Sequence, residues 1–439
     1  MMLGSPSRLI RPLRLWLPTL GLAALPLASG GCGSDAPAAS THGTTVAGGG
    51  ATSVATGGTS DVASPSGGSN AGTGASGAGG DVGGSGSGNG GGSAGSSSGG
   101  SNAGSDPGVM LPQVSADGDG DFTVGPNYTT DPDLTDQGKP KGKRFSFSMS
   151  SADSSIFKGD DATLSKPWRM AGQTSFNRSI TVYVPALYQD GTEAPVLVIQ
   201  DGPGPIDTIA RALDNLTVAE DPLKKIPAFV AVAVANGSDR DGSDGRGSER
   251  GLEYDTMSDR YSRFIDTEVL PAVIANPQVK AAYPNLKFTA NPEGRAAFGC
   301  SSGGAAALSM AWFANNVWHR AITYSGTFVA QQNTAQPEAV MFPYGAWEYH
   351  SNTELIKNTP IKPLRVTINA NQNDLGAGTG EAKQHDWLLA NQRTAAALKE
   401  KGYHYRYHYA EGLGHCDFKV EQQTIGENLS WLWRGYGAP

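Results

Sequence analysis

The chain lacks the charge distribution of a nucleic-acid-binding protein. Its 33 lysines and arginines are scattered along 439 residues, and the formal net charge is −8. Nucleic-acid phosphates are bound by clustered positive charge, so this distribution argues against nucleic acid as a partner. The chain also lacks a repeat with the regular period of a solenoid, which argues against a repeat architecture.

A long apolar run is also missing. The apolar stretch LWLPTLGLAALPLA is too short to span a membrane stably, and it follows a start that carries three arginines. This order is typical of an export signal. ASGGC follows and resembles a bacterial lipoprotein cleavage site, although Ser29 stands where such sites carry leucine. We expect residues 1–32 to direct export, to the periplasm or the cell surface, and Cys32 to carry a lipid as the sole membrane anchor.

Residues 33–107 contain few apolar side chains and consist largely of Gly, Ser, Ala, Thr and Asn. The chain holds 60 glycines, about twice the usual share, and most of the excess lies before residue 108. A segment without apolar surface cannot offset its ordering entropy and is expected to be a flexible coil, with a span of roughly 45–50 Å. We therefore predict a linker at 33–107 that tethers a folded domain at 108–439.

The hydrophobic pattern of the remaining chain changes once. RFSFSMS and RSITVYVP alternate apolar and polar residues and predict antiparallel strands. PVLVIQDG, PAFVAVAVAN, RAAFGCS, RAITYSG and LRVTINA are continuous apolar runs, typical of parallel strands buried on both faces. Helices are expected between them, at roughly 206–217, 258–275, 303–315, 384–401 and 419–434. The sequence predicts one α/β domain with a mostly parallel sheet, antiparallel N-terminal strands and helices on both faces, whose ligands bind where the strands end.

A candidate nucleophile lies between one of these strands and a helix. Gly299-Cys300-Ser301-Ser302-Gly303 fits the G-x-S-x-G pattern in the strand–turn–helix context that the pattern requires. The glycines leave space for Ser301 to expose its hydroxyl in a sharp turn. The N–H of Ser302, at the start of the helix, is placed to stabilise an oxyanion. The weaker alternative is a turn of small residues that serves only close packing.

A nucleophilic serine requires a base and an acid that orients the base, and in α/β-hydrolases these follow the serine as Asp or Glu and then His. His415 lies in the glycine-rich EGLGHCDF, between the last strand and the last helix, and is the expected base. Asp374 follows the preceding strand and is the expected acid, with Glu381 and Asp386 as rivals. Three other downstream histidines lack glycine neighbours: His319, His350 and His385. His404 and His408 lie in YHYRYHYA, a predicted strand whose histidines and Arg406 share one face, and we expect that face to be solvated.

Two cysteines remain besides the one at the lipid site. Cys300 directly precedes Ser301, and Cys416 directly follows His415. Cysteines left over in an exported protein are expected to pair, and a disulfide holds its two Cα atoms within about 7 Å. We therefore predict that a Cys300–Cys416 disulfide joins the serine loop to the histidine loop. The alternative is that both are small apolar fillers.

Over roughly 220 residues, from VLVIQDGPGP to GHCDF, the chain resembles the enterochelin-esterase-like branch of the α/β-hydrolases. The matching features are the loop at Asp201-Gly202 and the segments RGLEYD, RFIDTEVLPAV, GCSSGG and NDLGAG. This resemblance implies an α/β-hydrolase fold and a second oxyanion N–H, that of Gly202. The Cys-Ser, Asp and His-Cys arrangement is similar to that of the tannase and feruloyl esterase family, in which such a disulfide joins the catalytic loops, but the chain lacks that family's inserted lid domain.

These observations predict an exported serine esterase that hydrolyses a small-molecule or polysaccharide-linked carboxylic ester through an acyl-enzyme, without metal or organic cofactor. Arg250 and Glu253 of RGLEYD are expected to form a structural ion pair beside the cleft. Two alternatives remain open. One is acyl transfer to a sugar instead of water, and the other is a non-catalytic surface-binding lipoprotein on a hydrolase scaffold.

Overall fold

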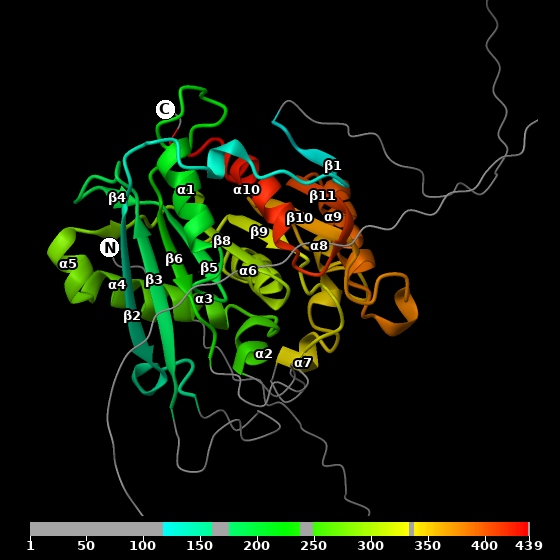
Figure 1. Ribbon diagram of the computed structural model, residues 1–439. Coiled ribbons are helices and arrows are strands. Elements are labelled where there is room, and N and C mark those ends of the chain that lie inside the picture. The colour runs from blue at the N-terminus through cyan, green and yellow to red at the C-terminus, as the bar shows by residue number, and fades with distance from the viewer. Residues whose placement is uncertain (1–116, 160–174, 238–248, 333–337, 438–439) are drawn as a thin grey trace, which may run out of the picture. The chain divides into compact units, whose positions relative to one another are not determined.

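A computed structural model describes residues 117–159, 175–237, 249–332 and 338–437, which form a central sheet with helices on both faces (Figure 1). The predicted export signal at 1–32, with Cys32, and the predicted linker at 33–107 lie outside the described residues. The sheet has nine strands, in the spatial order β1 (Gly120–Val124), β11 (His404–Gly414), β10 (Arg365–Asn373), β9 (Arg320–Tyr324), β8 (Arg295–Cys300), β5 (Val196–Gln200), β6 (Val230–Val234), β3 (Asn177–Val184) and β2 (Lys143–Ser150).

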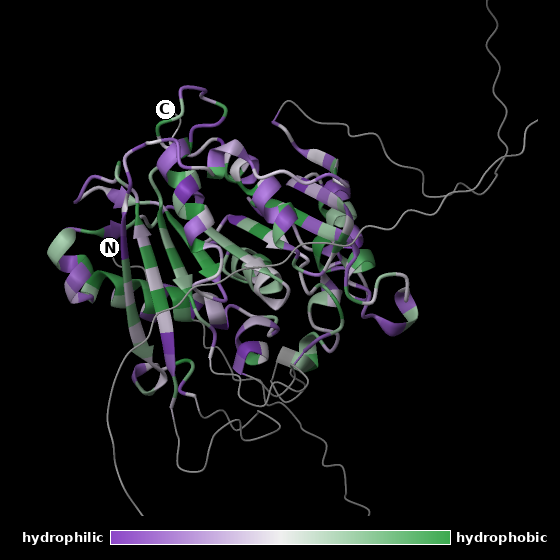
Figure 2. Ribbon diagram, in the orientation of Figure 1, coloured by the Kyte–Doolittle hydropathy of each residue, from purple (hydrophilic) through white to green (hydrophobic). Residues whose placement is uncertain are grey.

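The strands from β1 to β6 in this order are parallel, and β3 and β2 are antiparallel to their neighbours. The predicted α/β architecture with antiparallel N-terminal strands is thereby confirmed. A separate parallel pair consists of β4 (Glu193–Ala194) and β7 (Lys287–Phe288). Every residue of β5 and β6 is buried, as their continuous apolar sequences predicted, and Figure 2 shows these strands in green.

Helices cover both faces of the sheet. Alternate residues of β5 point to opposite faces, so Leu197 and Ile199 contribute to one hydrophobic core while Val196 and Val198 contribute to the other. The first core also contains residues of α1 (Ile206–Leu216) and α10 (Phe418–Leu432). The second contains residues of α3 (Arg260–Phe264), α4 (Leu270–Ala275), α5 (Pro277–Ala282), α6 (Ser302–Phe313), α8 (Leu355–Asn358) and α9 (Trp387–Lys401).

All five predicted helices are present within a few residues of their expected ends. The predicted helix at 258–275 consists of α3, a π-helical turn at Ile265–Val269 and α4. The sequence did not indicate the shorter helices, which are α2 (Glu249–Tyr254), α5, α7 (Glu338–Met341), α8 and the 3-10 turns Pro132–Leu134, Ser151–Asp153, Pro292–Gly294, Ala346–Tyr349 and Glu381–Lys383. None of the described helices combines the length and hydropathy needed to cross a membrane.

The prediction of a solvated face on β11 is wrong for Arg406 and His408, although His404 at the start of the strand is exposed. Arg406 and His408 are each only 2% exposed. β11 lies inside the sheet because β1, from the start of the described chain, pairs with it in parallel and forms the edge. Phe122 of β1 stacks on the His408 ring at 5.2 Å between centroids. The short β1 carries no distinctive sequence signal, so only the tertiary structure shows that this face is covered.

Candidate active site

The candidate nucleophile lies in the sharp turn between β8 and α6. Ser301 has φ 59° and ψ −130°, a conformation that a residue with a side chain adopts only under strain. A Cβ atom at Gly299 would lie 2.2 Å from the backbone of Gly303, so this position requires glycine. The two glycines of the motif thus allow strand and helix to meet closely, as the sequence pattern predicted.

The first N–H groups of α6 point toward the same turn. Ser301 is the N-cap of this helix, and its side chain makes no capping hydrogen bond. The N–H of Ser302, at the first helical position, has no acceptor within the helix and lies at the positive end of the helix dipole. This position supports the expected role of the Ser302 N–H as an oxyanion donor.

The Gly202 N–H, which was expected to be the second oxyanion donor, has another partner in the structure. The N–H of Gly202 donates to the carbonyl oxygen of Val234 at 2.9 Å. The chain continues its pairing with β6 beyond the end of β5, so this N–H is used within the fold and does not face the nucleophile as a free donor. The N–H of Asp201 is also bound, to the hydroxyl of Tyr254 at 3.0 Å.

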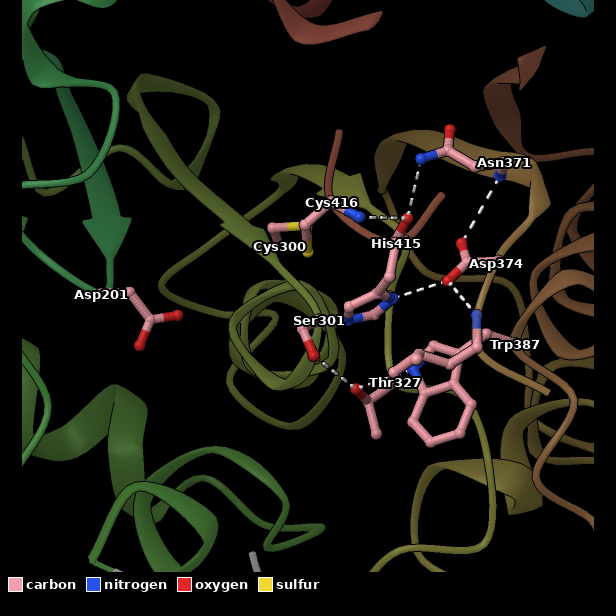
Figure 3. Close-up of a disulfide and its surroundings, with 12 residues drawn as sticks. Asp201, Cys300, Ser301, Thr327, Asn371, Asp374, Trp387, His415 and Cys416 are labelled. Carbon is pink, nitrogen blue, oxygen red and sulfur yellow. Dashed lines mark hydrogen bonds and ion pairs between the residues drawn. A yellow bond between two sulfur atoms is a disulfide. The ribbon is translucent and has the colours of Figure 1, made fainter. Parts of the chain in front are cut away.

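The structure brings His415 and Asp374 together. The Nδ1 atom of His415 lies 2.6 Å from Oδ1 of Asp374, whose side chain is fully buried. The same carboxylate oxygen accepts the N–H of Leu375 at 2.8 Å. In Figure 3 the imidazole lies between Asp374 and Ser301, with its other nitrogen turned toward the serine. This is the order of groups that a serine nucleophile, its base and the orienting acid require.

The rival residues are engaged elsewhere. Glu381 is exposed and pairs with Arg393 at 2.9 Å, and Asp386 caps α9 by accepting the N–H of Leu389 at 2.9 Å. Burial lowers the pKa of His350 to about 4 and the pKa of His408 to about 3, and neither ring contacts a carboxylate of the described residues. The remaining rivals have other partners: His319 with Glu293, His385 with the Lys383 carbonyl, and His404 with Asp119.

The predicted disulfide between Cys300 and Cys416 is confirmed. Their Cα atoms lie 6.0 Å apart across a sequence separation of 116 residues. The bond therefore holds the turn that carries Ser301 next to the loop that carries His415, as Figure 3 shows. The loop of His415 is also fixed from neighbouring strands, because the Cys416 N–H donates to Oγ of Ser325 at 3.2 Å and the Asn371 amide donates to the Gly414 carbonyl.

We predict that replacing both cysteines by serine lowers the free energy of unfolding by about 2–5 kcal/mol. The disulfide closes a long loop, and its removal frees the unfolded chain and releases two loops that must meet. Urea denaturation of the double variant and of the unreduced wild-type protein measures the difference. Titration of the unfolded, unreduced mature protein should find neither cysteine as a free thiol. Equal unfolding free energies, or two free thiols, would contradict the prediction.

Sequence reasoning missed Thr327 and Trp387. The Thr327 hydroxyl lies 3.3 Å from Oγ of Ser301 and accepts the indole N–H of Trp387 at 3.2 Å. An indole N–H only donates, so Thr327 accepts from Trp387, and its own proton remains available for a hydrogen bond to Oγ of Ser301. The Trp387 ring also meets the His415 ring edge to face, 5.9 Å between centroids. Their only signal in the sequence is their place, after β9 and at the start of α9.

A charged pair lies beside the turn that carries Ser301, and it is not the expected one. Arg250 binds the carboxylate of Asp201 through two N–H groups, at 2.8 and 2.9 Å. Glu253 is instead held by Arg178 in a pair whose side chains are both almost fully buried. The prediction of an Arg250–Glu253 pair is therefore wrong, because the two side chains leave α2 toward different elements. A Cβ at Gly303 would lie 3.0 Å from Asp201, which places this pair against the start of α6.

A buried carboxyl lies behind the first turn of α6. Asp255 accepts the side-chain amide of Gln331 at 2.7 Å, and the same amide lies 3.4 Å from Oγ of Ser302. Burial raises the pKa of Asp255 to about 6.

Among the described residues, the group with the spacing of metal ligands is Asp117, Asp119 and His404, and it lies at the start of β11, away from Ser301. The described residues around Ser301 present hydroxyl, imidazole and backbone groups suited to acyl transfer.

Several solved structures are similar to this chain. A ferulic acid esterase is 14% identical, with 67% of this chain and 99% of that chain covered and a TM-score of 0.43. The ferric enterobactin esterase of Salmonella typhimurium is 15% identical, with 67% and 59% covered and a TM-score of 0.40. A CE1 ferulic acid esterase of the anaerobic fungus Anaeromyces mucronatus is 11% identical, with 70% and 96% covered and a TM-score of 0.45. The chain thus spans about three fifths of the Salmonella enzyme.

A comparison with curated proteins gives no match. The similarity to the tannase family remains a prediction from the motif. A comparison with protein-family models matches residues 173–420 to the family described as "Putative esterase". Because this model matches more than half of the 439 residues, the chain belongs to that esterase family, and its sheet order and helix layers are those of the α/β-hydrolase fold.

Proposed function

We propose that the protein is a serine esterase in which Ser301 is the nucleophile, His415 the base and Asp374 the acid that orients it. The observation that carries this proposal is the hydrogen bond of 2.6 Å between His415 and Asp374, on a loop that the disulfide holds beside Ser301. Serine–histidine contacts often tighten only when substrate binds, so the hydrogen bond between the Ser301 and Thr327 hydroxyls in the resting protein is compatible with this role.

The reaction balances with these groups alone. Oγ of Ser301 forms a bond to the ester carbonyl carbon while its proton moves to His415, and the N–H of Ser302 stabilises the oxyanion. The carbon–oxygen bond to the alcohol then breaks, and His415 returns the proton to the leaving alcohol. Water then attacks the acyl carbon while His415 takes its proton, and the bond from that carbon to Oγ of Ser301 breaks. His415 returns the proton to Ser301 as the carboxylic acid leaves. Asp374 stabilises the imidazolium in both steps without accepting its proton.

We further propose that the protein acts outside the cytoplasm, attached through a lipid on Cys32. The basic start and apolar core of residues 1–32 support export, and so does the Cys300–Cys416 disulfide, since such bonds persist in oxidising compartments. The substrate is proposed to be a carboxylic ester, either of a small molecule or linked to a polysaccharide. A panel of acetyl, feruloyl, siderophore-type and long-chain acyl esters identifies its class.

A fluorophosphonate probe tests the proposed mechanism. Such probes phosphonylate a serine only when its hydroxyl is activated. We expect one probe per folded protein, and mass spectrometry should place it on the peptide that contains Ser301. Protein denatured before the addition should remain unlabelled. Absence of labelling in the folded protein would favour a binding protein on a hydrolase scaffold, and labelling of another residue would exclude Ser301 as the nucleophile.

A further inference from the structure

A cavity of about 590 Å³ opens at the edge of the sheet opposite Ser301, where β9, β10 and β11 begin. Its volume is in the range of pockets that hold small molecules. Its charged lining residues are four cations, one carboxylate and one histidine: Arg320, Lys362, Arg365, Arg434, Glu293 and His404. Four of the 33 lysines and arginines that are scattered along the sequence therefore lie together at this cavity.

Strand pairing explains why these cations meet. Arg320, Arg365 and His404 are the first residues of β9, β10 and β11. Arg365 is paired in register with Arg320 on one side and with His404 on the other. Like charges on neighbouring strands are destabilising unless opposite charge is supplied. The lining of this cavity therefore requires counter-charges.

The protein supplies counter-charges for two of these groups. Glu293 pairs with Arg320 at 2.6 Å, and Asp119 pairs with His404 at 2.8 Å. A further N–H of Arg320 donates to the carbonyl of Leu432, at the end of α10. The position of Arg320 is thus explained by the fold itself, since it satisfies the last carbonyls of a helix whose dipole is negative at this end.

The other cations have no such partner. Over the described ranges, no carboxylate lies within ion-pair distance of Lys362, Arg365 or Arg434. Arg365 stacks on Trp431 and donates one N–H to the carbonyl of that residue at 3.4 Å, which leaves other donors of its guanidinium unused. Arg434 donates to a backbone carbonyl, and its buried Nε has no partner. Three cations of the lining therefore make no direct ion pair among the described residues, and Asp117 and Asp119, which lie near Arg365, offset its charge only from a greater distance.

The titration of the arginines agrees with this geometry. Burial lowers the pKa of Arg320 to about 10, and Arg365 lowers it further, although Glu293 acts in the opposite direction. Burial also lowers the pKa of Arg365, and Asp119 and Asp117 offset this only in part. Both guanidinium groups would be stabilised by additional negative charge in the cavity.

We propose that this cavity binds a phosphate group, carried either by a soluble phosphorylated molecule or by a lipid headgroup. A phosphate carries up to two charges and several acceptor oxygens, so it can be shared by Arg365, Arg434 and Lys362. A single carboxylate would neutralise only one of them. The cavity is larger than one phosphate ion, and Ile361, 59% exposed in its lining, supplies an apolar wall for the rest of such a ligand.

Titration calorimetry on the intact protein tests this site with inorganic phosphate, glycerol phosphate and, as the carboxylate comparison, acetate at equal ionic strength. Vesicles of phosphatidylglycerol, with phosphatidylcholine as reference, test the lipid source by co-sedimentation. The site variant is Lys362→Gln/Arg434→Gln. The control is Arg263→Gln/Lys280→Gln, which removes the same charge from exposed positions on α3 and α5. A thermal melt without phosphate checks that both variants are folded.

We expect the wild type and the control to bind at least one of the two phosphate sources saturably, and the site variant to bind it at least about tenfold more weakly. The responding arm identifies the source. No saturable binding in either arm would overturn the proposal, as would equal binding by site and control variants or acetate affinity equal to that of phosphate. Because binding is measured directly, these outcomes do not depend on the proposed esterase activity.

Discussion

Ester hydrolysis by the Ser301→Ala variant is expected to fall by about 10⁴- to 10⁶-fold in kcat. The alanine removes the only atom that forms the acyl-enzyme, whereas the backbone N–H of Ser302 and the binding surface remain. The residual rate should therefore be the small acceleration over uncatalysed hydrolysis that an oxyanion donor and substrate binding provide without a nucleophile. Hydrolysis of a short p-nitrophenyl ester measures the loss.

Ser148→Ala is the matched control, because it removes the same hydroxyl from an exposed position on the edge strand β2. It should leave kcat unchanged. The thermal unfolding midpoint of Ser301→Ala shows whether the variant is folded, and it should stay close to that of the wild type, because alanine keeps the Cβ atom and with it the backbone strain at φ 59°. A folded Ser301→Ala protein with unchanged turnover would exclude Ser301 as the nucleophile.

The second large effect is expected at Asp374, where Asp374→Asn should lower kcat by about 10⁴-fold. An amide at this position no longer stabilises the imidazolium, and it favours the wrong tautomer of His415. The carboxylate accepts hydrogen bonds from His415, from the Leu375 N–H and, at 3.5 Å, from the Asn371 N–H. Asparagine has nearly the shape of aspartate, so the substitution removes the charge while keeping the shape. The pH profile of kcat/KM and the rate with a short ester measure the effect.

Glu381→Gln is the control for this experiment, since Glu381 was one of the two rival acids in the sequence and is the exposed one. It pairs with Arg393 on an exposed surface, so its neutralisation should change kcat by less than about threefold. A large loss in Glu381→Gln together with a small loss in Asp374→Asn would show that the acid has been assigned to the wrong residue. Fluorophosphonate labelling of both variants separates loss of activation from loss of substrate binding.

Periodicity and local chemistry explain what could be predicted from the sequence. Buried parallel strands need continuous apolar runs, so β5, β6, β8, β9 and β10 were recognisable. The strained turn at Ser301 needs small neighbours, and Gly299 and Gly303 supply them. His415 and Asp374 were predictable because they follow consecutive strands, whose ends meet at one edge of a parallel sheet. Cys300 and Cys416 were predictable because each adjoins one of the proposed catalytic residues.

Other features depended on contacts between distant segments. Gly202 lost its expected role because its N–H completes pairing with β6. Arg406 and His408 of β11 are buried because Phe122 of β1 packs on both of them. Arg250 met Asp201 instead of Glu253, although Glu253 lies one turn away on the same helix. Thr327 and Trp387 converge on Ser301 from elements that share no motif.

The sequence by itself determined the α/β class, the serine turn, the His415 and Asp374 candidates and the disulfide, because each depends on local patterning or on order along the chain. Only the tertiary structure decided which N–H groups remain free, which charges pair, and that cations far apart in sequence surround one cavity. Hydrogen bonds and ion pairs between distant residues depend on the packing of the whole sheet. That packing brings Arg320, Arg365 and Arg434 together, and their proximity cannot be read from any short segment of the sequence.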